Sequence, residues 1–587
     1  MNNLPKGGDF LLEQTDPSSI FTVEDFSQEH HMIYRTAIGF VNDKVLPVMN
    51  DLEAKKEGLN KELLLASGEL GLLGADVPEE YGGYDLDKVS SCIIAECIGK
   101  GGSFIQTHGG QTSIGIVPLV FFGTHEQKLQ YLPEFVTGEL VTAYALTEPG
   151  AGSDALSAKT KAVLSEEGKH YVLNGAKQFI TNAGIADVFI TFAKIDGDKF
   201  TAFIVDAHAE GVSTSPEEHK MGIKGSSTRS VYFDDVKVPL ENVLGEIGKG
   251  HLVAFNALNN GRFKMAANTI GFAKYALDVS VEYANERRQF NQPIAEFGLI
   301  KEKLADMAAK IYAMESTVYR TAGLLENKVQ SMDVSGPDGG RVVAACFDEY
   351  AVECSLNKVF TTECLGQVTD EGVQIHGGYG YISEYPIERL YRDSRVYRIF
   401  EGTNEINRTV ITNTLIRRGL SGQPPRSTLF PYTTLFRSQM AAGISVRNDA
   451  SDLVQACKDI ALFTLGALLE KYGKKIAQHE EIVGKLADII MSAFVMESAL
   501  LRARKALARD CQDSAQLKIN MANIFIYSNI NDVFNRAKEI MAAIADGERL
   551  AELYSDLGTL LQYTPKNTIA LRQEVAGAIS SANKYVS

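Results

Sequence analysis

The chain has 587 residues, more than one hydrophobic core usually organises, so we expect three or four domains. With 45% hydrophobic and 22% charged residues it has the composition of a globular protein, and its net charge of −16 argues against a nucleic-acid-binding surface. Seven scattered cysteines without a CxxC pair predict neither a disulfide framework nor a metal site.

Four regions differ in their hydrophobic pattern. Residues 20–140 show helical spacing interrupted by loops. Residues 141–245 contain short β-rich runs such as DVFITFAKI and FTAFIVDA, separated by turns and not by long helices, which predicts an antiparallel sheet or barrel. Helical patterns return over 246–420 and again over 440–587. The expected fold class is therefore mainly α, with a β middle domain and an appended helical domain.

The segment 421–439 fits none of these patterns. Within it, RSTLFPYTTLFRS at 426–438 repeats TLF on both sides of a Pro-Tyr pair. Its simplest interpretation is a linker between helical domains, but it also resembles a translated sequencing adaptor joined into the gene. We assign it no function.

The N-terminus, MNNLPKGGDF, has neither the basic nor the apolar part of a signal peptide. The longest apolar runs, such as residues 460–469, are too short to span a bilayer. We expect a cytoplasmic protein of bacterial type, or one bound peripherally to the inner face of the membrane.

Common catalytic signatures are absent from the sequence. There is no GxGxxG opening a helix after a strand, no P-loop, no HExxH and no GxSxG. A flavin bound by scattered loops stays open, because flavins do not require a Rossmann turn.

Three loops could carry chemistry. The loop at 143–157, AYALTEPGAGSDALS, offers backbone N–H groups and hydroxyls to a ligand, although a polar β-turn has the same pattern. The stretch 373–393 breaks a helix at a Gly-rich turn after His376, as an ordinary helix C-terminus also does. In the third, RVYRIFEGTNEINR at 395–408, Glu401 is either a catalytic base or an acid that precedes a helix.

Taken together, these blocks resemble the acyl-CoA dehydrogenase family. TEPGAGSD, GRFKMAA (261–267), ERRQFNQPI (286–294), QIHGGYGY (374–381) and YRDSRVYRIFEGTNEINR (391–408) occur in the family's order over about residues 30–420. The resemblance implies a helical domain, an antiparallel β-barrel domain and a helical bundle, with FAD lying among them.

The same resemblance implies a reaction, the α,β-dehydrogenation of an acyl-CoA thioester. Glu401 would remove the α-proton while the β-hydrogen leaves as hydride to flavin N5. The flanking Ile399 and Phe400 would keep this site dry, which makes the carboxylate more basic.

The implied contacts fall into two sets. The cofactor set contains Tyr144, Leu146, Thr147, Ser153, Phe179 (where many relatives have Trp), Ile180, Thr181, Arg287, Gln289, Gln374, Ile375, His376, Gly377, Gly378, Thr403, Asn404 and Glu405. The adenosine and pyrophosphate contacts among them would lie partly across a subunit interface. The substrate set contains Ser153, Asn259 (where relatives often have Asp), Arg262, Gly402, Gly109 and Gly110.

Three features favour a long-chain substrate. Gly298 stands where short-chain members tend to have Gln, the region 440–587 resembles that of very-long-chain members, and Gly109 and Gly110 leave room at the bottom of an acyl pocket. Close helix packing would explain these two glycines equally well.

Two other functions stay open: an acyl-CoA oxidase, or an assembly or scaffold protein on the same fold. The resemblance implies an electron-transfer flavoprotein as electron acceptor and a homo-oligomer, expected to be a dimer. Peripheral membrane contact is a further possibility.

Overall fold

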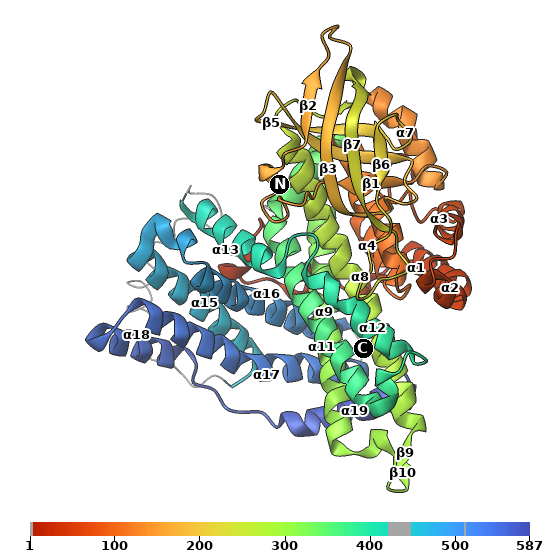
Figure 1. Ribbon diagram of the computed structural model, residues 1–587. Helices are drawn as coiled ribbons and strands as arrows, with labels where there is room; N and C mark the ends of the chain where they lie inside the picture. Colours follow the sequence, from red (N-terminus) through yellow and green to blue (C-terminus); the bar gives the residue numbers. More distant parts are fainter. Residues whose placement is uncertain (1–3, 421–447, 510–511) are drawn as a thin grey trace.

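The computed structural model describes residues 4–420, 448–509 and 512–587, so the segment 426–438 lies outside the described residues. A β-sheet lies at one end, long helices run through the middle, and the appended helices lie along one side (Figure 1). The described chain is mostly helical with a β middle region, as the sequence predicts.

Short helices precede the sheet. They are α1 (Gln28–Phe40), α2 (Met49–Glu53), α3 (Leu59–Glu69), α4 (Lys88–Ile98), α5 (Phe104–Gly109), α6 (Val117–Phe122) and α7 (His125–Thr137). Three begin at side-chain caps, in which Ser27, Asp87 and Thr124 accept backbone N–H bonds from residues in the first turn. A π-helical turn, Gly110–Gly115, follows α5 directly.

The sheet contains β1 (Thr142–Ala145), β2 (Lys161–Leu164), β3 (His170–Thr181), β4 (Val188–Ile195), β5 (Lys199–Asp206), β6 (Val212–Thr214), β7 (Thr228–Pro239) and β8 (Val243–Leu244). Its order is β6-β7-β3-β2-β4-β5-β8, with β1 also beside β4. Most ladders are antiparallel, but β1–β4 and β2–β4 are parallel. Since β4 is buried on both faces, it joins the core inside the sheet to the core beneath it.

Long helices follow the sheet. The elements are α8 (Gly250–Glu286), the hairpin β9 (Arg288–Gln289) and β10 (Gln292–Pro293), α9 (Gly298–Gln330), α10 (Gly339–Glu349), α11 (Ala351–His376), α12 (Pro386–Ser394) and α13 (Asn404–Leu420). The 3₁₀ turns Gly377–Tyr381 and Arg395–Arg398 border α12. Helix α8 packs against α4, α9 and α11, and so connects the sheet end of the molecule with the hairpin end.

The appended helices are α15 (Ala450–Tyr472), α16 (Glu480–Arg509), α17 (Gln512–Ile544), α18 (Gly547–Leu560) and α19 (Thr568–Ala582). They pack on α9 and α13, and their buried side chains belong to the same hydrophobic cluster as those of α8 and α11. The appended region is therefore part of the main core and not a separate body.

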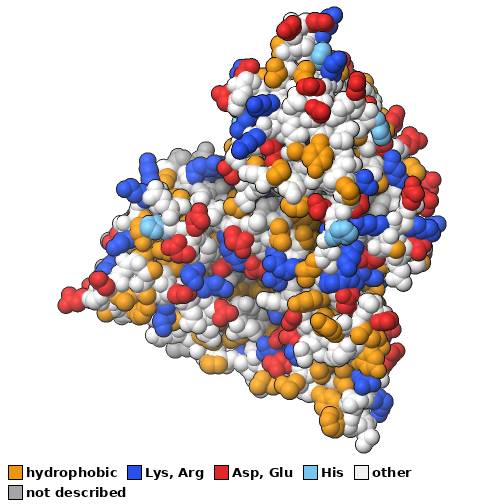
Figure 2. Space-filling model, in the orientation of Figure 1, with side chains coloured by type: hydrophobic (Ala, Val, Ile, Leu, Met, Phe, Trp, Pro, Cys, Tyr) orange, Lys and Arg blue, Asp and Glu red, His pale blue; other side chains and the backbone are white. Residues whose placement is uncertain are grey.

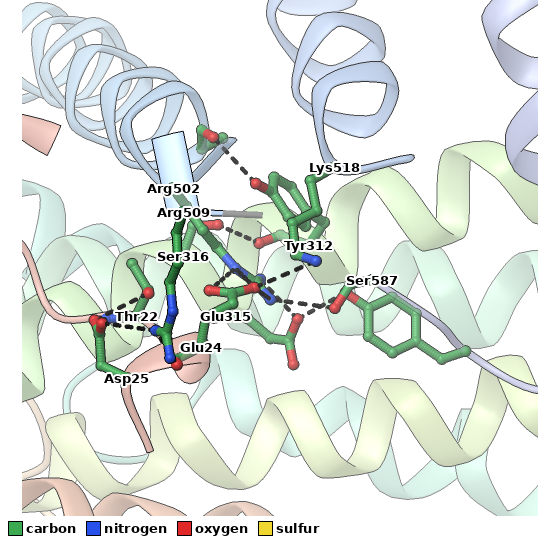
Figure 3. Close-up of polar contacts among 12 residues, drawn as sticks. Thr22, Glu24, Asp25, Tyr312, Glu315, Ser316, Arg502, Arg509, Lys518 and Ser587 are labelled. Atoms are coloured by element: carbon green, nitrogen blue, oxygen red, sulfur yellow. Dashed lines mark hydrogen bonds and ion pairs between the residues drawn. The ribbon is translucent and has the colours of Figure 1, made fainter. Parts of the chain in front are cut away.

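A buried ion network fastens this region to the rest of the chain (Figure 3). The guanidinium of Arg502, on α16, donates to Glu24 at 2.8 Å, to Glu315 of α9 at 2.9 Å and to Ser587 at 3.1 Å. Burial alone would raise the pKa of the Glu315 carboxyl, but Lys274 and Arg502 lower it to about 2. Glu315 is therefore ionised at neutral pH, and four separate segments meet at one buried arginine.

Three features of the described ranges bear on function. No helix among them is long and apolar enough to cross a membrane. Nor do they contain a group of three or more His, Cys, Asp or Glu side chains arranged to hold a metal ion. The six described cysteines are buried free thiols.

Candidate active site

Glu401 lies in a strained turn between the 3₁₀ turn Arg395–Arg398 and α13. Its φ is +56° and that of Gly402 is +78°, a left-handed conformation that costs a residue with a side chain about 1–3 kcal/mol. Two buried cations hold the turn. Arg262 Nε donates to the Glu401 carbonyl at 3.1 Å, and Lys358 Nζ donates to the Gly402 carbonyl at 2.8 Å. The backbone that presents Glu401 is thus fixed from both α8 and α11.

The carboxyl of Glu401 has a pKa near neutral pH. Its Oε2 atom is buried and has no hydrogen-bond partner among the described residues. Burial raises the pKa of Glu401 to about 7, although Arg262 and Lys358 both act to lower it. Burial likewise lowers the pKa of Lys358 to about 7, with the Glu401 charge opposing this effect. A carboxylate with these properties suits general-base chemistry at neutral pH.

A cavity of about 50 Å³ opens at this carboxyl. Its lining includes Gly109, Thr181, Gly261, Phe400 and Glu401, from four different parts of the chain. A Cβ atom on Gly261 would lie only 2.5 Å from Glu401 Oε2, so a side chain at this position would displace the carboxyl.

One expectation about this cavity is wrong for the single chain. Phe400 shields the carboxyl, but Ile399 is 53% exposed and does not. The turn that presents Glu401 directs these two neighbouring side chains differently.

A second, smaller cavity of about 10 Å³ adjoins the first. The two share Gly109, Ser113 and Asn268 in their linings. A Cβ on Gly109 would meet only Ser113 Oγ, at 3.9 Å, whereas one on Gly110 would lie 2.8 Å from Asn182 Nδ2. Both glycines line the first cavity, but Gly109 borders open space where the two cavities meet, whereas Gly110 also packs closely against Asn182.

The sheet end contributes several expected cofactor contacts. Phe179 sits at a bulge in β3 with φ +59° and is 58% exposed, while the next residue, Ile180, is buried in the sheet core. Tyr144 is buried and lies close to Glu401. Burial raises the pKa of its phenol, and the Glu401 charge raises it further. Thr181 lines the cavity of Glu401.

The loop from Thr147 to Asp154 is anchored by the side chain of Glu148. Glu148 is buried, and its carboxylate accepts hydrogen bonds from Lys177 Nζ at 2.7 Å and from the Lys159 N–H at 2.6 Å. Leu146 is buried, Thr147 is half-buried and Ser153 is exposed at the loop's surface.

The other expected cofactor contacts lie far away. Arg287 follows α8, 25 residues after Arg262, which at about 1.5 Å per residue is about 37 Å along the helix. Arg287, Gln289, Gln374, Gly377 and Gly378 are exposed there, but the side chains of Ile375 and His376 are buried. His376 stacks on Tyr283 and its Nδ1 bonds to the Gly372 carbonyl at 2.7 Å. A single chain therefore does not bring the cofactor contacts at the sheet end together with those at the far end of α8.

Exposed apolar side chains gather at this far end. Phe290, Leu299, Tyr381 and Ile569 are each more than 70% exposed, and hydrophobic side chains cover this part of the surface (Figure 2). A patch of this kind is typical of a protein interface.

Of the remaining expected residues, some are hydrogen-bonded within the protein and others are partly or fully exposed. Asn259 Oδ1 accepts from Arg262 Nη1 at 2.9 Å, so both act here on the protein itself. Asn404 is buried and bonded to Lys358 and Thr362. Thr403 and Gly402 are half-buried and Glu405 is exposed.

The sequence prediction missed Lys358. It lies 43 residues before Glu401 on another helix, in the apolar run LNKVF, and a lone lysine inside such a run is the one local sign of its burial.

Comparison with known proteins accounts for this arrangement. The acyl-CoA dehydrogenase N-terminal, middle and C-terminal domains match residues 27–139, 143–236 and 248–416, and a further acyl-CoA dehydrogenase C-terminal domain matches 456–557. A probable acyl-CoA dehydrogenase of Bacillus subtilis (strain 168) is 49% identical over 99% of both chains. The chain belongs to the acyl-CoA dehydrogenase family.

Other relatives are similar over most or part of the chain. The mitochondrial very long-chain specific acyl-CoA dehydrogenase of Rattus norvegicus is 34% identical over 90% of this chain and 83% of its own. Subunit CarC of the caffeyl-CoA reductase-Etf complex of Acetobacterium woodii is 38% identical over 67% of this chain and 100% of its own. The crystal structure of an acyl-CoA dehydrogenase complexed with FAD from Bacillus anthracis superposes with a TM-score of 0.97 at 49% identity, covering 99% and 100% of the two chains.

The protein is a flavoprotein oxidoreductase of this family, with FAD as its cofactor. The residues at the sheet end fit a flat aromatic ring system. An exposed Phe179 ring stands at a bulge, and Glu401, whose Oε2 has no partner among the described residues, lines a cavity with Thr181.

Proposed function

We propose that this protein catalyses the α,β-dehydrogenation of a long-chain acyl-CoA to the trans-2-enoyl-CoA, with Glu401 as the base, as a step of fatty acid β-oxidation. The observation that carries the proposal is the carboxyl of Glu401: its Oε2 atom is buried without a partner among the described residues, the residue lines a cavity, and its pKa is about 7. Half of these carboxyls are ionised at pH 7, which is what proton abstraction at neutral pH needs.

The chain's own residues account for the proton transfer. Glu401 Oε2 takes the α-proton, and the electron pair of the broken C–H bond forms the new double bond as a hydride leaves the β-carbon. The backbone N–H of Glu401 stabilises the negative charge that develops on the thioester oxygen. Arg262 and Lys358 hold the strained turn, so the carboxylate does not have to reorganise during the reaction. FAD, when bound, supplies the acceptor at N5 for the hydride.

The cofactor contacts are proposed from two copies of the chain. Tyr144, Leu146, Thr147, Ser153, Phe179, Ile180 and Thr181 would hold the flavin ring, with Ile180 acting through its backbone because its side chain is buried. Arg287, Gln289 and residues 374–378 of a second copy would hold the adenosine and pyrophosphate. The distance along α8 and the exposed apolar patch support such a homodimer.

The preference for a long acyl chain rests on Gly109. The two cavities, about 50 and 10 Å³, are too small for a long chain, so its entry requires side chains to move. Met265 lines the first cavity and is an unbranched side chain that adapts readily. Gly109, at the boundary, leaves the passage free of a side chain.

Electrons would leave through an electron-transfer flavoprotein. The relative in an Etf complex, which covers two thirds of this chain, supports this partner. An oxidase would instead pass its electrons to oxygen.

The test is the bleaching of the bound flavin by palmitoyl-CoA under anaerobic conditions. We expect bleaching in the wild type and in Glu166→Gln, an exposed acid in the turn after β2, and none in Glu401→Gln although FAD stays bound. Bleaching of Glu401→Gln at the wild-type rate would refute the role of Glu401.

Two further results would change the proposal in part. Bleaching by octanoyl-CoA and not by palmitoyl-CoA would keep the mechanism and overturn the chain length. Rapid reoxidation of the bleached protein by air would favour an oxidase.

A further inference from the structure

A cavity of about 340 Å³ lies between the N-terminal segment and helices α9, α11 and α16. It shares no lining residue with the cavity of Glu401, so it does not belong to the proposed active site. Its volume is within the range of small-molecule binding sites.

Glu353 of α11 provides a buried acceptor in this cavity. Its side chain is 1% exposed, and its Oε1 atom accepts from the Gly8 N–H at 2.8 Å. Its Oε2 atom is buried without a partner among the residues that the structure describes. A buried carboxylate oxygen without a partner is unfavourable, so this atom favours a donor in the cavity.

The rest of the lining is aromatic and acidic. Aromatic walls come from Phe10, Phe21, Tyr350 and Phe494, and three further carboxylates come from Asp9, Glu13 and Asp16. Of the two cations in the lining, Lys6 and Arg320, the arginine is already engaged. Arg320 pairs with Glu497 at 2.9 Å, donates to Ser498 at 3.0 Å and lies over the Phe494 ring.

We propose that this cavity binds a small organic ammonium ion, whose N–H group donates to Glu353 Oε2 and whose alkyl part packs against the aromatic walls. An anion would meet four carboxylates, and a neutral apolar molecule would leave Glu353 Oε2 unsatisfied. An ammonium ion satisfies the acceptor, reduces the excess negative charge and interacts favourably with aromatic rings.

Binding should depend on pH through Glu353. The charged groups around it are Asp9 and Glu13 of the N-terminal segment, Arg320 of α9, Glu349 of α10, Arg418 of α13 and Glu497 of α16. Burial raises the pKa of Glu353 to about 7, with the Gly8 N–H and the two arginines opposing it. Glu353 is therefore about 10% ionised at pH 6 and about 90% at pH 8, so the ammonium should bind about tenfold more tightly at pH 8.

The experiment is calorimetric titration of the full-length holoenzyme with n-butylammonium. We expect saturable binding about tenfold tighter at pH 8 than at pH 6, and release of about half a proton per ion at pH 7, measured in buffers of different ionisation heat. Butyrate and n-butanol should not bind.

Two variants make the test specific. In Glu353→Gln, which keeps an acceptor for the Gly8 N–H, affinity at pH 8 should fall at least about tenfold and lose its pH dependence. Glu349→Gln is the matched control: Glu349 also accepts from the N-terminal segment, at Gly7, but does not line the cavity, so its variant should still bind and keep the pH dependence of binding.

Filling the cavity gives an independent check. Leu324, on α9, lines the cavity. Leu324→Phe should weaken binding of the ammonium ion by occupying part of the cavity, and it changes no carboxylate. Undetectable binding to the wild type, or equal binding to Glu353→Gln and Glu349→Gln, would overturn the proposal.

Discussion

Replacing Glu401 by glutamine should make the protein more stable, to a degree that depends on pH. The pKa of the carboxyl rises from its ordinary 4.5 to about 7 in the folded protein. Since a tenfold change in an ionisation constant corresponds to about 1.4 kcal/mol, ionised Glu401 costs the folded state about 3 kcal/mol. Glutamine has nearly the same shape and never ionises.

The sign of the effect follows from the direction of the shift. A carboxyl whose pKa is raised in the folded protein does not affect the free energy of unfolding below pH 4.5. As the pH rises to about 7 the carboxyl ionises and the free energy of unfolding falls, and above that pH the loss is complete. The advantage of Glu401→Gln should therefore be small at pH 5 and about 3 kcal/mol at pH 8. If the 587 residues unfold together, this is a rise in Tm of about 2–3 °C at pH 8 and less than about 1 °C at pH 5.

The assay is scanning calorimetry of the FAD-loaded wild type and variant across this pH range. Glu166→Gln, an exposed acid, should give the same small difference at both pH values. A Glu401→Gln variant that is no more stable at pH 8 than the wild type, or whose advantage does not grow with pH, would refute the buried high-pKa carboxyl.

Three other changes test separate parts of the structure. Lys358→Met removes a charge that lowers the pKa of Glu401, so the pH midpoint of flavin bleaching should rise, by up to about one pH unit because Lys358 is itself only partly charged near pH 7, measured by anaerobic stopped-flow. Gly109→Leu should reduce kcat/KM for palmitoyl-CoA at least about tenfold and spare butyryl-CoA, while Gly39→Ala, which has open space around it, should change neither. Arg502→Met should destabilise the protein by about 3 kcal/mol, because Glu24 and Glu315 lose their shared guanidinium while Lys274 still pairs with Glu315. Calorimetry would contradict this last prediction if Tm stayed unchanged.

The sequence predicts the arrangement of helices and strands well, because periodicity and turn residues are local signals. The parallel pairing of β1 and β2 with β4 depends on how the chain crosses between strands, and no local pattern encodes it.

The candidate site is predicted less evenly. The motif predicts Glu401 as the base, and this role stays a prediction, whereas the left-handed φ of this residue and the lysine that holds its turn depend on contacts between distant helices. The expectation for Ile399 is wrong because adjacent residues in a turn face different ways: Phe400 lines the cavity, while Ile399 is 53% exposed. The domain boundaries drawn at 140, 245 and 420 stay predictions.

The arginine at the centre of the ion network limits how this protein can be shortened. A chain cut after α13 would have the length of a relative that matches only the first two thirds, yet it would keep Glu24 and Glu315 and lose the cation between them. In the shortened chain Glu315 keeps Lys274, but the hydrophobic side chains of α9 and α13 that pack on the appended helices lose their cover. A minimal enzyme made from this sequence would therefore need polar side chains on those faces of α9 and α13, as well as a solution for the acids that Arg502 pairs with.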